Sequence, residues 1–388
     1  MQMTPELSMM IQAAEVCIDR FIPFVIYSLP GKEEVEFFAS LPNAEGLSPA
    51  PADPDADSFF ISRFGADEPY MAGVKASMSI NDILEWASAN PDTRFEPPCE
   101  FPVRSSTLRS GWEKAFRSVR KRLRATKGKV VLSRHTALFS SRPLVPLALE
   151  YISLNPANFG YLCFTPETGV WYGSTPELLL ETDGKGEFRT MALAGTRWDD
   201  SEPWDSKNIA EHAFVSSYIT HRLAIAGLDV EVGDVTTLST NGVEHLLTPI
   251  KARGNAEFPT LLSLLNPTPA VAGVPLDVAM AEIDLFETHQ RRCYAGAVGL
   301  RLGGISRAFV NLRCAFAAPA VALKGSLPGW IHNVYAGGGL VADSDPKLEW
   351  EELNRKSLAL LKVITDGDIY SSIEPHTVQL KYLKSHPF

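Results

Sequence analysis

Several features that mark common protein classes are scarce in this sequence. Its five cysteines are odd in number and scattered, and no two stand in a CxxC pair. We therefore expect neither a disulfide framework nor a zinc site, but a reducing compartment in which each cysteine acts as a small apolar residue. The five are Cys17, Cys99, Cys163, Cys293 and Cys314.

An excess of basic charge and long apolar runs are also missing. The 388 residues carry a net charge of −10, and the pI near 5.4 argues against a protein that binds nucleic acid electrostatically. No stretch has the length of a transmembrane span. The first twenty residues contain Glu6, Glu15 and Asp19 and lack a basic start followed by an apolar run, so we expect no signal peptide. These absences favour a cytoplasmic protein without membrane partners.

The most informative stretch lies near the C-terminus. Gly337, Gly338 and Gly339 remove three side chains in a row, which lets the backbone and a ligand approach closely. Asp345 and Pro346 then predict a helix start, with an acidic cap and proline at the first helical position. The apolar face of this helix consists of Trp350, Leu353, Leu360, Leu361 and Ile364.

Three charged residues flank that apolar face, namely Glu349, Glu352 and Lys356. Two carboxylates three positions apart are neighbours on a helix and repel each other unless a positive group, such as a hard cation, stands between them. The alternative is a solvated helix face on which Lys356 supplies the counter-charge. The helix alone leaves both interpretations open.

Lys129 begins a short predicted strand, residues 129–134, in which Val131 and Ser133 share its face while Val130 and Leu132 lie on the other. Both faces carry apolar residues, which indicates a strand covered on both sides. The lysine amine could reach solvent along its stem. If it is buried instead, desolvation favours its neutral form, and it can act as a base.

Two further acids lie on predicted elements. Glu177 ends a turn, residues 174–177, between two strands, where a chain reversal can present a single carboxyl group to a cavity. Glu211 lies on a long predicted helix, residues 205–226, closed by Gly227. Arg222 shares its line on this helix and is a possible structural partner.

The remaining elements complete a chain rich in strands. A capping box is predicted at Ser110–Glu113, followed by a helix with a basic, solvated surface. A second helix is predicted over residues 276–292. Strands are predicted at 21–29, 59–64, 160–165, 170–173, 178–182, 245–254, 294–300, 309–316 and 331–336.

In this order, the segments resemble the chorismate-utilising enzymes and, among them, the isochorismate synthases. The resemblance covers residues 105–365. Any one of its motifs would be weak evidence, but the ordered set is specific. The motifs are KVVLSR at 129–134, STPE at 174–177, ALAGT at 192–196, EH at 211–212, HLLTP at 245–249, NPTPAVAG at 266–273, YAGAVG at 294–299, NLRC at 311–314 and GGG…SDP…EWEE from 337 to 352.

The resemblance implies an α/β (α+β) fold, a single large domain in which antiparallel β-sheets are sandwiched and flanked by helices. Residues 1–104 would be the N-terminal part of this fold and residues 105–388 the chorismate-binding catalytic region. The implied cofactor is Mg²⁺, with Glu211 and Glu352 as direct ligands and Glu349 acting through bound water. The implied substrate-binding residues are Thr196, His245, Tyr294, Arg313, Gly337, Gly338, Gly339 and Lys356.

The implied reaction adds water to C2 of chorismate while the C4 hydroxyl leaves, which requires a base and an acid on opposite sides of the ring. Lys129 would be the base and Glu177 the acid. The product, isochorismate, would serve menaquinone or siderophore biosynthesis, and the enzyme would be a monomer or homodimer without a glutamine amidotransferase.

Three alternatives remain open. A salicylate synthase would use the same groups and add pyruvate elimination. An aminating enzyme, such as component I of aminodeoxychorismate or anthranilate synthase, would receive ammonia from an amidotransferase, but Lys129 argues against the anthranilate type. A non-catalytic acidic scaffold would not explain why acid, base and metal motifs are all intact.

Overall fold

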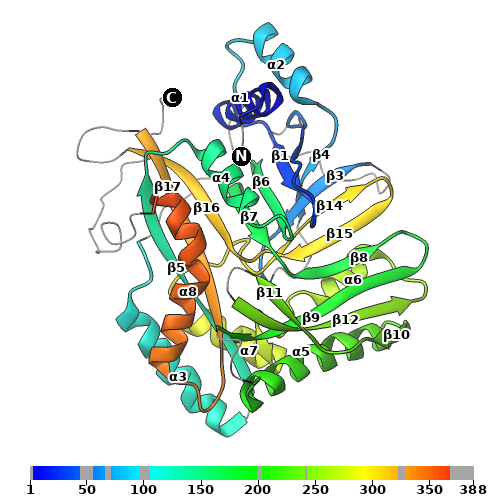
Figure 1. Ribbon diagram of the computed structural model, residues 1–388, viewed down its shortest axis with the longest axis vertical. Coiled ribbons are helices and arrows are strands. Elements are labelled where there is room, and N and C mark those ends of the chain that lie inside the picture. The colour runs from blue at the N-terminus through cyan, green and yellow to red at the C-terminus, as the bar shows by residue number, and fades with distance from the viewer. Residues whose placement is uncertain are drawn as a thin grey trace.

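The computed structural model (Figure 1) describes residues 3–43, 56–65, 71–95, 105–126, 128–198, 203–240, 243–321 and 328–367. The helices are α1 Pro5–Arg20, α2 Ile80–Ala89, α3 Arg109–Thr126, α4 Leu144–Ser153, α5 Ser206–Ile225, α6 Phe258–Leu265, α7 Leu276–Phe286 and α8 Pro346–Ile364. The strands are β1 Phe24–Ser28, β2 Glu36–Ala39, β3 Ser58–Ser62, β4 Met71–Lys75, β5 Lys129–Ser140, β6 Phe159–Thr165, β7 Gly169–Thr175, β8 Leu178–Thr182, β9 Glu187–Arg197, β10 Asp229–Val232, β11 Thr236–Thr240, β12 Val243–Arg253, β13 Gly273–Val274, β14 Ala297–Leu302, β15 Ile305–Val310, β16 Cys314–Val321 and β17 Pro328–Leu340.

Two antiparallel sheets form the core of the fold, as predicted. The first has the strand order β13-β5-β17-β16-β7-β6-β1-β2, and the second has the order β10-β12-β9-β8-β15-β14-β3-β4, with β11 paired to β12. Aromatic side chains join the sheets, because Phe159 on β6 stacks on Phe309 of β15 with ring centroids 4.5 Å apart. The buried core of the protein therefore includes the space between the two sheets.

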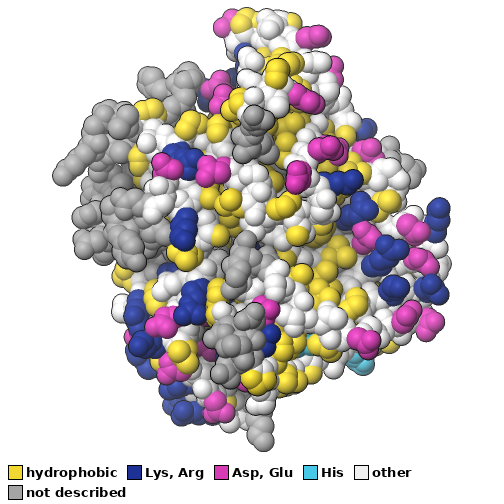
Figure 2. Space-filling view, in the orientation of Figure 1, with side chains coloured by type: hydrophobic (Ala, Val, Ile, Leu, Met, Phe, Trp, Pro, Cys, Tyr) yellow, Lys and Arg dark blue, Asp and Glu magenta, His cyan; other side chains and the backbone are white. Residues whose placement is uncertain are grey.

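Helices cover the outer surfaces (Figure 1). Helix α8 lies along β17 and β5, beside α3, and α5 lies along β9 and β12. Helices α1 and α4, with the C-terminal end of α8, pack on the first sheet through a second apolar cluster. Acidic and basic side chains stand close together at the edge formed by β8, β9 and β12 (Figure 2), where Arg189 pairs with Glu181 and Arg253 with Glu187.

Two of the points at which the chain passes from one sheet to the other lie next to each other. The link from β7 to β8 carries Glu177, and the link from β15 to β16 carries Arg313. Backbone hydrogen bonds join the links, because the Val310 amide donates to the carbonyl oxygen of Glu177 and the Ser174 amide donates to that of Arg313. Two residues distant in sequence are thus held at the same end of the sandwich.

This crossing corrects the prediction of one strand over residues 309–316. The apolar pattern is continuous, but the chain bends at Arg313, whose φ of 49° lies in the left-handed region. The side-chain amide of Asn311 donates to the carbonyl oxygen of Cys293, and its side-chain oxygen accepts from the Tyr161 hydroxyl. These tertiary contacts, which no local pattern reveals, divide the segment into β15 and β16.

Two helix boundaries also differ from the prediction. The capping box at Ser110–Glu113 is wrong, because α3 already begins at Arg109 and the Glu113 carboxylate accepts from the Arg109 side chain at 2.9 Å. The helix predicted over residues 276–292 ends at Phe286, because Glu287 adopts an extended conformation. The cap at Asp345 is confirmed, since its carboxylate accepts from the amides of the first turn of α8.

Four of the five cysteines are buried free thiols, as their predicted apolar role requires, and Cys99 lies outside the described residues. Within the part of the chain that the structure describes, no helix is both long and apolar enough to cross a membrane.

Candidate active site

The glycine run forms part of β17, next to the start of β5. Gly339 is paired with Val131 and Gly337 with Ser133. A Cβ atom on Gly339 would lie 2.7 Å from Cε of Lys129 and 2.8 Å from a carboxylate oxygen of Glu211. The missing side chain therefore leaves the space that these two functional groups occupy.

Lys129 is buried, with 1% of its surface exposed, and its Nζ lies 2.7 Å from Oε1 of Glu211. Val130 and Leu132, on the opposite face of β5, pack in the apolar cluster of α3, α7 and α8, so both faces of the strand are covered as predicted. Burial alone would raise the pKa of Glu211, but the lysine amines, with Lys129 first, hold it below its ordinary value. Lys129, rather than Arg222, is thus the partner of Glu211.

Glu177 has the electrostatic state of an acid that can donate a proton. The residue is 3% exposed, and burial raises the pKa of its carboxyl group from 4.5 to about 8, against the opposing effect of Lys129 and Lys356. A carboxyl group with this pKa still carries its proton at neutral pH. Raised carboxyl pKa values of this kind are typical of general acids in enzymes.

The acids of α8 and the lysines around them form two ion pairs. Lys356 lies 2.6 Å from Glu352 and also donates to the carbonyl oxygen of Gly337 at 3.1 Å. Lys207, on the first turn of α5, pairs with Glu349 at 2.9 Å. Burial nevertheless holds the pKa of Glu349 above its ordinary value, and the nearby Glu352 carboxylate adds to this effect. The Lys207 charge therefore does not fully compensate the buried Glu349 carboxylate.

His245 and Thr196 lie on adjacent strands, β12 and β9. Nδ1 of His245 is 2.8 Å from the carbonyl oxygen of Gly195, which can only accept, so this nitrogen carries the hydrogen. Burial, with the nearby Arg313 and Lys356 charges, lowers the His245 pKa to about 3. The imidazole is therefore neutral, and its Nε2 is a hydrogen-bond acceptor. Thr196 is held by Asn208 of α5, whose side chain accepts from its amide.

Arg313 and Tyr294 complete the predicted set. Arg313 donates to the carbonyl oxygen of Lys356 at 3.1 Å, and burial lowers its pKa. The Tyr294 hydroxyl lies next to Gly337, where an added Cβ would be only 2.6 Å away, and its ring stacks on Tyr335 at 5.3 Å. Gly338 lies between Gly337 and Gly339 on β17, and its Cβ position faces Leu353 of α8.

A buried ion pair between Arg291 and Glu287 contacts the backbone near the start of β5. Arg291 forms a bidentate pair with Glu287, at 2.9 and 2.6 Å, and donates to the carbonyl oxygens of Val131 and Val271. The Glu287 carboxylate in turn accepts from the Ser133 amide at 2.6 Å. The pair therefore ties β5, which begins at Lys129, to the segment that leads to Tyr294.

The donors near the site suit a hard cation in their chemistry, because Glu211, Glu349 and Glu352 supply only carboxylate oxygens. Among the described residues, no three His, Cys, Asp or Glu side chains come close enough to form a complete metal site. Positive charge next to Glu349 would stabilise its buried carboxylate. A cation here would complete its ligands from outside this set, as Mg²⁺ does with water or substrate oxygens.

The family model of chorismate binding enzymes matches residues 75–365, three quarters of the chain. The chain belongs to this family. Isochorismate synthase MenF of Escherichia coli (strain K12) is 34% identical over 248 residues, 60% of this chain and 54% of MenF. Isochorismate synthase EntC of the same strain is 30% identical over 252 residues, 61% of this chain and 62% of EntC.

The chain thus spans about half to two thirds of the length of these relatives. A solved structure of MenF, described as the menaquinone-specific isochorismate synthase from E. coli, matches the fold with a TM-score of 0.68. It covers 90% of this chain and 91% of that one at 22% identity, which supports the shared fold. The α+β architecture predicted from the sequence motifs is therefore confirmed.

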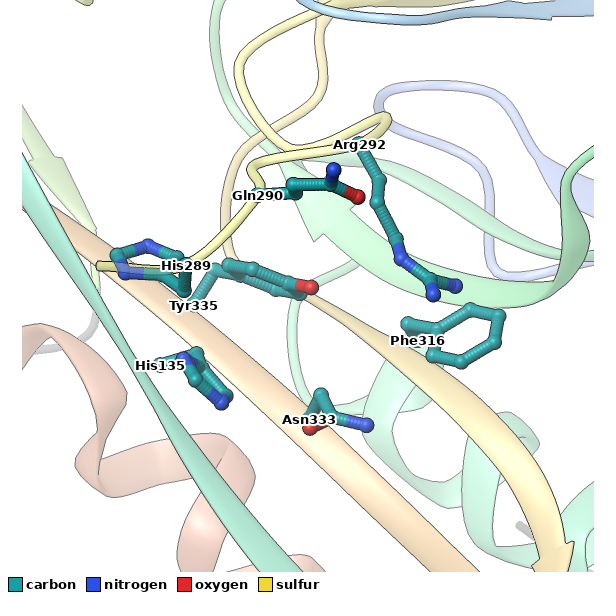
Figure 3. Close-up of a pocket in the computed structure, with 7 residues that line it drawn as sticks. All are labelled: His135, His289, Gln290, Arg292, Phe316, Asn333 and Tyr335. Carbon is teal, nitrogen blue, oxygen red and sulfur yellow. The ribbon is translucent and has the colours of Figure 1, made fainter. Parts of the chain in front are cut away.

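A small pocket of this chorismate binding enzyme is lined by His135, His289, Gln290, Arg292, Phe316, Asn333 and Tyr335 (Figure 3). Its volume is about 10 Å³, the space of one water molecule, so it cannot hold chorismate. The rings of His135, His289 and Tyr335 approach one another there, and Arg292 lies over the Phe316 ring at 4.5 Å. Two of the lining residues, Asn333 and Tyr335, belong to β17.

Three residues around the site, Lys207, Glu287 and Arg291, are not predicted from the sequence. Lys207 precedes Glu211 by four positions on one helix, a spacing that places both on the same face. Glu287 and Arg291 have the same spacing, and both fall in the part of the predicted helix 276–292 that is not helical in the structure. Besides the pairing of Glu287 with Arg291, the contacts of these residues are with other elements, such as Glu349 and the β5 backbone, and no local pattern identifies them.

Proposed function

We propose that this protein is an isochorismate synthase, a cytoplasmic isomerase that converts chorismate to isochorismate with Mg²⁺. One observation carries the proposal: the buried Glu177 has a pKa near 8, and the buried Lys129 lies close enough to oppose that shift. The reaction needs such an acid and base within one cavity. Family membership and the names of the relatives support the same conclusion.

With its amine in the unprotonated form, Lys129 would take a proton from the water that adds to C2 of the ring. Glu177 would donate its proton to the C4 oxygen as the C4–O bond breaks and the ring double bonds shift. The water oxygen forms the new C2–O bond, and the departing hydroxyl leaves as water. Proton exchange with solvent would then restore both groups.

Other side chains would bind and orient the substrate. Arg313 and Lys356 supply cations for its carboxylates, and Tyr294 supplies a hydroxyl group beside Gly337. His245, which is neutral, would line the ring and offer Nε2 as an acceptor, and Thr196 lies beside it. The backbone of residues 337–339 would close over the ligand.

Glu211 and Glu352 would hold Mg²⁺ directly, and Glu349 would support it through water. The bound cation would supply charge stabilisation for the substrate's carboxylate during the displacement. Because Glu211 is also the partner of Lys129, it connects the metal-binding and base positions. We infer that residues 105–388 form the catalytic region and residues 1–104 the N-terminal part of the same fold.

Product analysis tests the proposed function. Purified protein incubated with chorismate and Mg²⁺ should yield isochorismate without an amidotransferase. Salicylate with pyruvate would instead support the eliminating alternative. An aminated product formed from chorismate and ammonium would support the aminating alternative.

A further inference from the structure

A cleft of about 760 Å³ opens between α8, α4 and the ends of β9 and β12. This volume is ample for a small-molecule ligand. Arg313 lines its wall, as does Val243, which precedes His245 by two positions on β12. The guanidinium of Arg313 donates to the backbone of Lys356, so the cleft borders the predicted substrate-binding residues.

The cleft carries uncompensated positive charge in a protein whose net charge is −10. Arg313, Arg355 and Lys362 all line it, and among the described residues none of the three has a carboxylate within ion-pair distance. Two acids also line it, but both face Arg142, which lies 2.6 Å from Glu150 and 4.0 Å from Asp366. The remaining charge of the lining is therefore cationic.

Arg355 is held in a defined place although its side chain is exposed. Its guanidinium lies 5.3 Å from the ring centroid of Trp198, which directly follows β9. Stacking on an indole face favours a cation and restricts the motion of a long side chain. The contact joins α8, which carries Lys356, to the strand that carries Thr196. An arginine thus spans the cleft between two walls of the candidate site.

We propose that this cleft is the entrance to the active site and that Arg355 and Lys362 capture the substrate, a small dicarboxylate, before it reaches Arg313. This inference rests on the proposed function, because chorismate carries two carboxylates. Cations that line a concave surface raise the local concentration of an anionic ligand and its association rate. Arg355 and Lys362 are too exposed to take part in the chemical step. They would instead increase the rate at which the substrate binds and the preference for a doubly charged substrate.

Steady-state kinetics of three Arg355 variants test the inference. For Arg355→Gln we expect KM to rise and kcat/KM to fall about fivefold, and for Arg355→Glu about tenfold or more, with much smaller changes in kcat. The effect should shrink as ionic strength increases from about 0.02 to 0.3 M, because salt screens charges at this distance. Arg355→Lys keeps the charge and should restore KM to within about twofold of the wild type.

Lys347→Gln is the matched control. Lys347 lies on the first turn of the same helix, is exposed, and lies outside the cleft lining, so its loss removes one charge without changing the entrance. The control should retain the wild-type KM and salt dependence. The capture role is refuted if Arg355→Glu matches this control, if it lowers kcat without changing KM, or if Arg355→Lys fails to rescue.

Binding without turnover separates this inference from the proposed function. Chorismate is titrated calorimetrically into Glu177→Gln protein, with and without the Arg355→Gln substitution. A weaker Kd in the double variant supports capture whatever product the wild-type enzyme forms. Equal Kd values overturn capture even where the wild type yields isochorismate.

Discussion

Replacing Glu177 by glutamine should remove activity and raise stability at the same time. In the folded protein the carboxyl pKa is raised from 4.5 to about 8. Between these values the unfolded chain releases the proton while the folded protein retains it, so this residue lowers the free energy of unfolding as pH rises. Glutamine keeps the shape and never ionises, so the variant escapes this loss.

The size of the effect follows from the same shift, at 1.36 kcal/mol per pKa unit. We expect the free energy of unfolding of the variant to exceed that of the wild type by about 1 kcal/mol or less at pH 5 and by roughly 4 kcal/mol at pH 8. Any change in packing adds the same amount at every pH, so the growth of the difference with pH is diagnostic. Loss of the general acid should also lower kcat by about 10²–10⁴-fold.

Denaturant or thermal unfolding at pH 5 and pH 8 measures this difference. Glu287→Gln is the matched control, because Glu287 is similarly buried but its pKa is held below its ordinary value: the charge and hydrogen bonds of Arg291, together with His289 and the Ser133 amide, outweigh burial. Its loss should destabilise the protein, and more at pH 8 than at low pH. A Glu177→Gln difference that does not change between pH 5 and pH 8, or a variant with near-normal kcat, would refute the assignment of Glu177 as a buried, protonated acid.

Three other predictions follow from the contacts of the site. Gly339→Ala should lower kcat/KM strongly, because its Cβ would lie 2.8 Å or less from Lys129 and Glu211. Gly338→Ala, whose Cβ would have its nearest neighbouring atom at 3.4 Å, should lower kcat/KM less. Equal losses in the two variants would contradict the steric argument. EDTA should abolish turnover and Mg²⁺ should restore it. Glu352→Gln should raise the Mg²⁺ concentration required for half-maximal activity while retaining the far-UV circular dichroism of the wild type. Full activity after chelation would contradict the metal assignment. Arg291→Lys should lower kcat about 10²-fold with little change in KM, because a lysine cannot reproduce its bidentate pair and two carbonyl contacts; unchanged kcat would show that the ion pair does not position β5.

The sequence predicted the elements that carry the site better than their connections. The cap at Asp345, the apolar face of α8 and the covered strand at Lys129 all depend on local patterns of a few residues, and the structure confirms them. The run at 309–316 looked like one strand because its apolar pattern is continuous. Only the contacts of Asn311 and the left-handed backbone of Arg313 reveal that it crosses between the sheets.

Site residues could be named from ordered motifs, but their partners could not. The pairing of Glu211 with Lys129 joins residues 82 positions apart, and that of Lys207 with Glu349 joins residues 142 positions apart. Such pairs depend on how helices and sheets pack against each other. Helical spacing along α5 instead indicated Arg222 as a possible partner of Glu211. The Arg222 side chain donates to the carbonyl oxygen of Leu264.

Oxygen labelling tests the central claim, that Lys129 activates water for addition to C2. Wild-type protein given chorismate and Mg²⁺ in H₂¹⁸O should form isochorismate that carries one ¹⁸O atom at C2, located by mass spectrometry of fragments. Lys129→Ala should form no labelled product under the same conditions. Isochorismate without solvent oxygen, or labelled product from Lys129→Ala at the wild-type rate, would contradict the account.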